Sequence, residues 1–261
     1  MDEQSTEVRA QAVDRVLSVL TILAAGPKSI SDVARELGVH RSTALRLLRV
    51  LEARKFVRRE GDLRYRAGSM LISLGQQALE DSDLRAIAAP HLARLHDTTR
   101  ETVHLAIRED DEVLYVDKID GQAAVRMWSR IGKRGSIHCT GVGKAMAAFL
   151  PRAQLEDLSR RLKYERHTAT TITDRESFLA EMAITRERGW AVDDAEHEPL
   201  VHCIAAPVMQ ANGSVSAISI ASPVTSLEEL RSFVPNMLST AAAISRDQGV
   251  EPGSTPAASS R

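Results

Sequence analysis

SISDVARELGVHRSTALRLLRVLE, residues 29–52, is the stretch that decides the fold of the N-terminal part of this 261-residue chain. Ser29 followed by Asp32 is typical of a capping box that opens a helix. Gly38 ends that helix, because a left-handed backbone costs least without a Cβ atom. A second helix is predicted over residues 41–53, and since only three residues separate the two, they must turn sharply, as in a helix-turn-helix. The side chains expected inward at helical spacing are Ile30, Val33, Ala34, Leu37, Ala44, Leu45, Leu48 and Leu51.

The flanking residues predict a winged form of this motif. A preceding helix that stops at Gly26 and Pro27 is indicated by an apolar stripe at Val13, Val16, Leu17, Leu20 and Ala24. After the motif, residues 57–59 and 63–66 predict two short strands around a turn at 60–62. Both strands carry arginine, so the hairpin would be a basic wing. We expect a winged helix-turn-helix domain over residues 8–67.

Basic residues concentrate in this domain. Residues 41–66 contain nine arginine or lysine residues against three acidic ones, a local net charge of +6 in a chain whose total is -1. Such a patch favours phosphate binding, although a solvated basic face on a helical hairpin would give the same composition. In a helix-turn-helix the second helix enters the major groove of double-stranded DNA. The predicted DNA-binding residues are Ser31, Arg41, Ser42, Thr43, Arg46, Arg49, Arg58 and Arg64.

Bulk composition limits the class of protein. The length allows two domains, and 43% hydrophobic, 26% charged and only 3% aromatic residues indicate globular domains with aliphatic cores. The apolar runs are too short to span a bilayer and the N-terminus is acidic, so we expect no membrane partner. Two cysteines 64 positions apart make a disulfide framework implausible and indicate a reducing compartment, the cytoplasm.

A linker helix is predicted after the wing, within residues 68–82. Leu71, Leu74 and Ala78 lie on one side of it and could either cap the winged domain or pack against a second copy. We favour a homodimer, because specific recognition usually needs two recognition helices about 34 Å apart.

Residues 83–247 predict a second domain in which helices and strands alternate. Helices are expected at 87–98, 143–149, 153–160 and 178–188, and strands at 103–107, 113–117, 125–129, 203–208 and 216–221. Short polar turns at 109–112 and 211–213 indicate antiparallel neighbours. The fold class is therefore α+β with two domains, the second an α/β sandwich with a mostly antiparallel sheet. The small-residue tail, 248–261, is expected to be disordered.

The motifs together resemble the IclR family of bacterial transcription regulators. The resemblance is carried by the opening stretch, by RYRAGSMLISLG (64–75), and by HCTGVGKAMAAFLP (138–151), TITD (171–174), RGWAVDDAEHE (188–198) and VHCIAAPV (201–208). It covers roughly residues 8–245. It implies a homodimer or homotetramer that reads palindromic operators, most often as a repressor of catabolic genes. It also implies a GAF-like second domain that binds a small-molecule effector.

Thr140–Lys144 is the strongest effector-binding candidate in the sequence itself. It opens a helix at Thr140, Gly141, Val142 and Gly143, where free backbone N–H groups and the helix dipole would attract a carboxylate. The same glycines could simply make a tight turn, and the spacing is not that of a nucleotide-binding P-loop, so no cofactor is expected.

Family resemblance adds further effector-binding residues. It implies that Met127, Asp193, Cys203 and Ser219 line the effector pocket together with Ala221, which replaces a second serine and so puts the smallest keto acids in doubt. Residues 126–146 and 164–174 look most like the branch that responds to sugar acids such as 2-keto-3-deoxygluconate.

Two other classes of function remain as alternatives. Cys139 and Cys203 could serve a metal- or redox-responsive regulator with His138, His197 and His202, but no spacing typical of a metal site joins them. We therefore predict no metal. A cysteine-dependent hydrolase is the least favoured alternative, since neighbouring residues on a strand face opposite ways and no nucleophile motif is present. We predict that the protein is not an enzyme.

Overall fold

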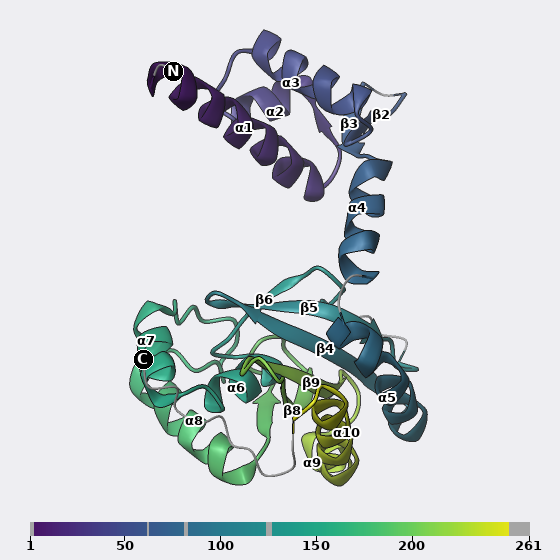
Figure 1. Cartoon of the computed structure of the whole chain (residues 1–261), viewed down its shortest axis with the longest axis vertical. Helices are drawn as coiled ribbons and strands as arrows, with labels where there is room; N and C mark the ends of the chain where they lie inside the picture. The colour runs from purple at the N-terminus through teal and green to yellow at the C-terminus, as the bar shows by residue number, and fades with distance from the viewer. Residues whose placement is uncertain (1–2, 62, 81–82, 124–126, 251–261) are drawn as a thin grey trace. The chain divides into compact units, whose positions relative to one another are not determined.

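The computed structural model describes residues 3–61, 63–80, 83–123 and 127–250. They fall into two compact units, residues 1–81 and 82–261 (Figure 1). No helix among the described residues is long and apolar enough to cross a bilayer.

The N-terminal unit is a winged helix-turn-helix, as predicted. Its helices are α1 (Glu3–Ala24), α2 (Ile30–Glu36), α3 (Arg41–Ala53) and α4 (Ser69–Glu80). Its sheet is antiparallel in the order β1-β3-β2 and contains β1 (Lys28–Ser29), β2 (Val57–Arg59) and β3 (Arg64–Ala67). The apolar core joins α1, α2, α3 and the sheet through residues such as Leu23, Val33, Leu48 and Tyr65.

Both ends of α2 have the chemistry predicted for them. The Ser29 side chain accepts from the Asp32 backbone N–H at 3.2 Å, and the Asp32 carboxylate accepts from the Ser29 backbone N–H at 3.1 Å. Gly38 has φ 64°, and the N–H groups of Gly38 and Val39 donate to the carbonyls of Arg35 and Ala34. This is the Schellman arrangement that satisfies the end of a helix. It places α3 directly after α2.

Two details of the predicted packing were wrong. On α1 the buried side chains are Val19 and Leu23, whereas Val13 and Leu17 are 58% and 57% exposed. The predicted apolar stripe and the observed buried stripe of α1 share Val16 and Leu20, so helical spacing alone could not distinguish them. On α3, Leu45 and Leu47 are both half-buried, but it is Leu47 that packs against the core.

The C-terminal unit contains a six-stranded, wholly antiparallel sheet in the order β6-β5-β4-β9-β8-β7, which confirms the predicted fold. The strands are β4 (Thr102–Glu109), β5 (Glu112–Ile119), β6 (Arg134–Ser136), β7 (Ala191–Asp194), β8 (His202–Met209) and β9 (Val215–Ser222). The helices are α5 (Asp83–Thr99), α6 (Gly141–Ala148), α7 (Arg152–Arg161), α8 (Arg175–Arg188), α9 (Leu227–Arg231) and α10 (Val234–Asp247).

The strand predicted over residues 125–129 is a correction. Residues 127–129 belong to no strand, and the first two residues of that range lie outside the described residues. The edge strands β6 and β7 were not predicted, because three and four residues are too few to show an alternating pattern. Most of the predicted tail, residues 251–261, also lies outside the described residues.

Helices cover both faces of this sheet. One apolar core joins α6, α7 and α8 to the sheet, and a second joins α5, α9 and α10 to the opposite face. Figure 1 shows α7 and α8 at the left of the sheet and α5, α9 and α10 at the right. Alternation along β9 follows this division, since Ile218 and Ile220 enter the second core while Ser219 and Ala221 face a cavity beside α6.

Candidate DNA-binding face and effector pocket

The predicted DNA-binding residues lie on the surface of the N-terminal unit. Thr43 is half-buried and the other seven are exposed, on α2, α3 and the β2–β3 hairpin. On the wing, Arg66 and Arg58 reach the carboxylate of Glu60 at 2.9 and 3.7 Å. Arg41, Ser42 and Arg46 lie in the N-terminal half of α3, directly after the turn, and all three are exposed. The geometry therefore presents a cationic helix beside a cationic hairpin.

A cavity in the C-terminal unit collects eight of the nine predicted effector-binding residues. They come from the first turn of α6, from β7, β8 and β9, and from the loop before β6: Met127, Thr140, Gly141, Val142, Asp193, Cys203, Ser219 and Ala221. The ninth, Gly143, does not line the cavity, which is a correction. The room left for water-sized molecules is about 30 Å³, so the walls are nearly closed on one another.

The first turn of α6 is held tightly against the sheet. A Cβ atom on Gly141 would lie 2.8 Å from the Cys203 sulfur, and one on Gly143 would lie 2.6 Å from backbone atoms of Ile137. Both positions therefore need glycine for packing. Thr140 caps the helix by accepting from the Gly143 N–H at 3.2 Å. Gly141 and Val142 line the cavity, and their backbone N–H groups, in the first turn of α6, have no acceptor within the helix.

A buried histidine links the sheet to the loop over the cavity. His104 on β4 lies opposite Ser219 on β9, with Nδ1 3.1 Å from the Ser219 Oγ and Nε2 2.8 Å from the Ser129 Oγ. Burial lowers the pKa of His104 to about 3, so the ring is neutral and one ring nitrogen donates while the other accepts. Its hydrogen bonds fix one side of the cavity.

Acidic groups lie in and next to the cavity wall. Burial raises the pKa of Asp193 to about 7, although its carboxylate accepts from the Glu196 N–H at 2.8 Å. Glu196 pairs with Lys144, whose side chain is 1% exposed, and the described lining contains neither lysine nor arginine. Asp193 is therefore poised between its charged and neutral forms near neutral pH, and its neutral form could donate a hydrogen bond.

Neither cysteine is prepared as a nucleophile. Burial raises the pKa of Cys139 to about 12 and that of Cys203 well above its usual range, so both are thiols at neutral pH. The imidazole of His202, next to Cys203 in sequence, is turned to the Asp194 carboxylate at 2.8 Å.

Seven cavity residues were not predicted from the sequence. They are His104, Tyr115, Trp128, Ser129, His197, Glu198 and Val201. The sequence contained one signal that was missed. His104 lies among the apolar residues of β4, so it had to be buried with them. The other six lie on loops or on β5, where sequence spacing does not reveal which residues meet.

A winged helix-turn-helix with an exposed cationic helix, followed by a domain with a small cavity lined by both apolar and polar groups, defines a DNA-binding regulator that carries its own sensor domain. Two family models match the chain: "IclR helix-turn-helix domain" over residues 12–61 and "Bacterial transcriptional regulator IclR C-terminal" over residues 76–246. The chain therefore belongs to the IclR family of bacterial transcription regulators.

Named relatives agree with this assignment over most of the chain. The Escherichia coli K12 regulators XynR and KdgR are 33% and 32% identical over 92% and 95% of this chain and 97% and 98% of their own. The E. coli K12 repressor AllR is 33% identical over 85% of this chain and 83% of its own.

Solved structures show the same fold. The Thermotoga maritima IclR matches with a TM-score of 0.77 and 30% identity over 92% of this chain and all of its own. An IclR homologue from Microbacterium hydrocarbonoxydans complexed with 4-hydroxybenzoate matches with a TM-score of 0.76 and 25% identity, again over 92% of this chain and all of its own.

Proposed function

We propose that this regulator acts as a homodimer or homotetramer that represses a catabolic operon until a small carboxylic acid enters the cavity beside α6. Support comes from the relative named as a repressor and from the homologue that holds an aromatic carboxylic acid. Residues 8–67 would bind the operator, residues 68–82 would link the two domains, and residues 83–247 would bind the effector. A regulator of bacterial operons works in the cytoplasm, and we assign it no catalytic role.

The observation that carries the proposal is the meeting of the α6 N-terminus with hydroxyl groups in one cavity. Gly141 and Val142 offer backbone N–H groups at the positive end of the helix dipole, where an anion is stabilised. With no cationic side chain in the described lining, the carboxylate would have to be held by these N–H groups and by hydroxyls such as that of Ser219. Asp193 in its neutral form would add a donor.

The rest of the cavity sets the size and polarity of the effector. Val142, Val201 and Tyr115 give it an apolar side, while His104 and Ser129 give it polar groups. A cavity of about 30 Å³ is too small for a whole sugar acid, so its walls must separate on binding. An effector that opens them would favour one arrangement of the domain over another, which shifts operator affinity.

Calorimetry with sugar acids, aromatic acids and short keto acids tests the ligand class. We expect a sugar acid such as 2-keto-3-deoxygluconate to give saturable heat and to quench Trp128, which lies in the cavity wall. Heat from 4-hydroxybenzoate alone would show that the effector is an aromatic acid and not a sugar acid. Heat from none of these carboxylates would remove the carboxylate proposal.

Footprinting on the DNA upstream of the gene for this protein tests operator binding. The expected result is a protected palindrome that is released by the acid found in calorimetry. Protection that strengthens with that acid would reverse the sign of control, and no preference over random fragments would remove the repressor assignment.

A further inference from the structure

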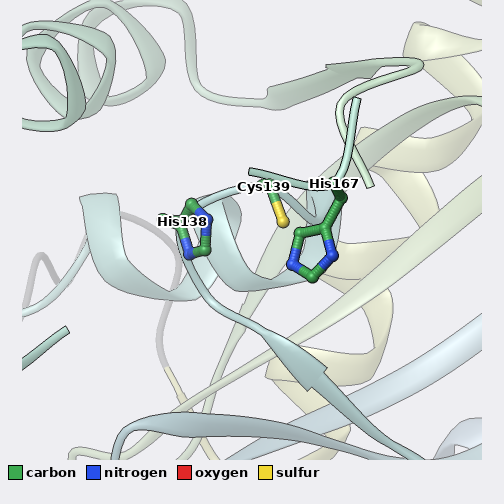
Figure 2. A group of neighbouring side chains, drawn as sticks. All are labelled: His138, Cys139 and His167. Carbon is green, nitrogen blue, oxygen red and sulfur yellow. The ribbon is translucent and has the colours of Figure 1, made fainter. Parts of the chain in front are cut away.

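A cluster of nitrogen and sulfur side chains lies beside the effector pocket and takes no part in the function proposed above. His138, Cys139 and His167 each bring one potential ligand atom, and these atoms lie within 4.8 Å of one another. Figure 2 shows the thiol of Cys139 between the two imidazole rings. A fourth group joins them, since the Cys139 Sγ is 3.6 Å from the His197 Nδ1.

The distances suit a soft or borderline divalent ion. Zinc binds cysteine and histidine tetrahedrally at bond lengths of roughly 2.0–2.3 Å, which places neighbouring ligand atoms about 3.5 Å apart. The separation of the Cys139 and His197 atoms already has this value. The ligand atoms of His138, Cys139 and His167, which lie within 4.8 Å of one another, would have to close by up to about 1.3 Å, a movement within reach of side-chain rotation.

Hydrogen bonds aim the rings as they do in metal sites. His138 Nε2 is 3.0 Å from the Glu165 carbonyl, so this nitrogen donates and Nδ1 is left with a lone pair. A carbonyl behind a ligating histidine is a common outer partner at metal sites, because it fixes both the ring and its tautomer. His167 Nε2 is similarly placed 3.4 Å from the Ser136 Oγ.

Burial at this place is compatible with a metal site. Cys139 and His138 are 0% and 1% exposed, while His167 is exposed and gives a route from solvent. The carboxylates of Asp193 and Glu196 act electrostatically on Cys139, and the nearby Lys144 is already paired with Glu196. Lys133 acts electrostatically on His197, so the positive and negative side chains around the ligand set roughly balance.

We propose that Cys139, His138, His167 and His197 form a zinc-class metal site that joins the start of α6 to the loops at residues 167 and 197. As the ion binds, the S–H bond of Cys139 breaks, its proton leaves to solvent and a metal–sulfur bond forms, with no change of oxidation state. The spacing along the chain conceals the site, because its ligands come from three separate segments. Since His197 also lines the effector pocket, the ion would fix one wall of that pocket.

Metal titration of the chelator-treated full-length protein tests the site. Zinc is added in competition with a chromogenic chelator, and cobalt is used as a spectroscopic probe, because cobalt bound to a thiolate gives an ultraviolet charge-transfer band. We expect one ion per chain and a band that Cys139→Ser abolishes. His167→Gln, at an exposed position, should weaken zinc binding on the order of 10- to 100-fold or more.

His202→Gln is the matched control, since His202 lies on β8 and pairs with Asp194 rather than with the cluster. It should bind zinc as the parent chain does. Circular dichroism of each variant separates loss of a ligand from loss of fold. Absence of saturable binding, a cobalt band that survives Cys139→Ser, or equal losses in His167→Gln and His202→Gln would each overturn the proposal, and none of these results bears on effector or operator binding.

Discussion

The two units of the chain treat polar side chains in opposite ways. Within the described ranges, every buried polar or charged side chain lies between Thr99 and Ser245, in the C-terminal unit. The N-terminal unit instead presents its cationic side chains on the surface around an apolar core. DNA can be bound by exposed charge, whereas selecting a small molecule needs groups withdrawn from water, which costs stability unless they are paired.

The largest test of this contrast is removal of the buried cation. Lys144→Met should lower the free energy of unfolding of the C-terminal unit by about 3–5 kcal/mol, because Glu196 would remain buried without its partner. Both tryptophans, Trp128 and Trp190, lie in this unit, so urea unfolding followed by tryptophan fluorescence reports it. Arg134→Met removes an ion pair with Glu112 whose side chains are about half exposed, and should cost about 1 kcal/mol or less. Equal costs would contradict the contrast.

A pH series tests whether Asp193 is a stability cost. Its pKa is raised from 3.8 to about 7, so between these values the folded chain holds a proton that the unfolded chain has lost. Stability from this group therefore falls as pH rises from about 4 to about 7, by up to about 1.4 kcal/mol per pH unit. Asp193→Asn cannot titrate, and its stability relative to the parent chain should rise across the same window.

Asp174 provides the opposite case at the surface. It caps α8, and hydrogen bonds from Ser177 lower its pKa below 3.8, so its contribution is kept above that value and lost as the pH falls further. Asp174→Asn should therefore show no relative gain between pH 4 and 7. A parallel trend in the two variants would show that Asp193 is not withdrawn from water.

Two glycines test how closely α6 must approach the sheet. Gly141→Ala should cost about 1–3 kcal/mol and weaken effector binding, since its Cβ atom would lie 2.8 Å from the Cys203 sulfur. Gly75→Ala, on α4 with nothing within 4 Å of the new atom, should instead stabilise its helix by roughly 0.5–1 kcal/mol. Thermal unfolding by circular dichroism measures both, and a loss at Gly75 would show that α4 is covered there.

The same contrast explains what could be predicted from the sequence. The start of α2 depends on Ser29 with Asp32 and the turn to α3 depends on Gly38, all near neighbours in the chain, so this geometry followed from local rules. In the second unit the long hairpins were predicted, but β6 and β7 were too short to show a pattern. Three cavity residues were predicted from the helix start at residues 140–142, and five came from family resemblance. His104 and Trp128 meet them only through strand register and a loop path that spacing does not encode.

Among the exposed residues, Arg46 should carry sequence recognition. It is exposed on α3, and a bidentate arginine–guanine contact is worth about 1–3 kcal/mol. Arg46→Ala should therefore weaken binding to the footprinted operator roughly 10- to 100-fold while changing binding to random duplex less, as measured by fluorescence anisotropy. Arg152→Ala, exposed on α7, is the control and should leave both affinities unchanged. Equal losses on both duplexes would reduce Arg46 to a phosphate contact.

The smallest expected effect separates the wing from the recognition helix. Arg64 is exposed on β3, where a hairpin follows the DNA backbone rather than base edges. Arg64→Ala should weaken operator and random duplex by the same factor, and the slope of log affinity against log salt should become shallower by about 1, because one fewer counterion is released. If Arg64→Ala lowered the affinity for the operator alone and left the salt slope unchanged, Arg64 would instead contact bases in a groove, and the wing would contribute to sequence specificity.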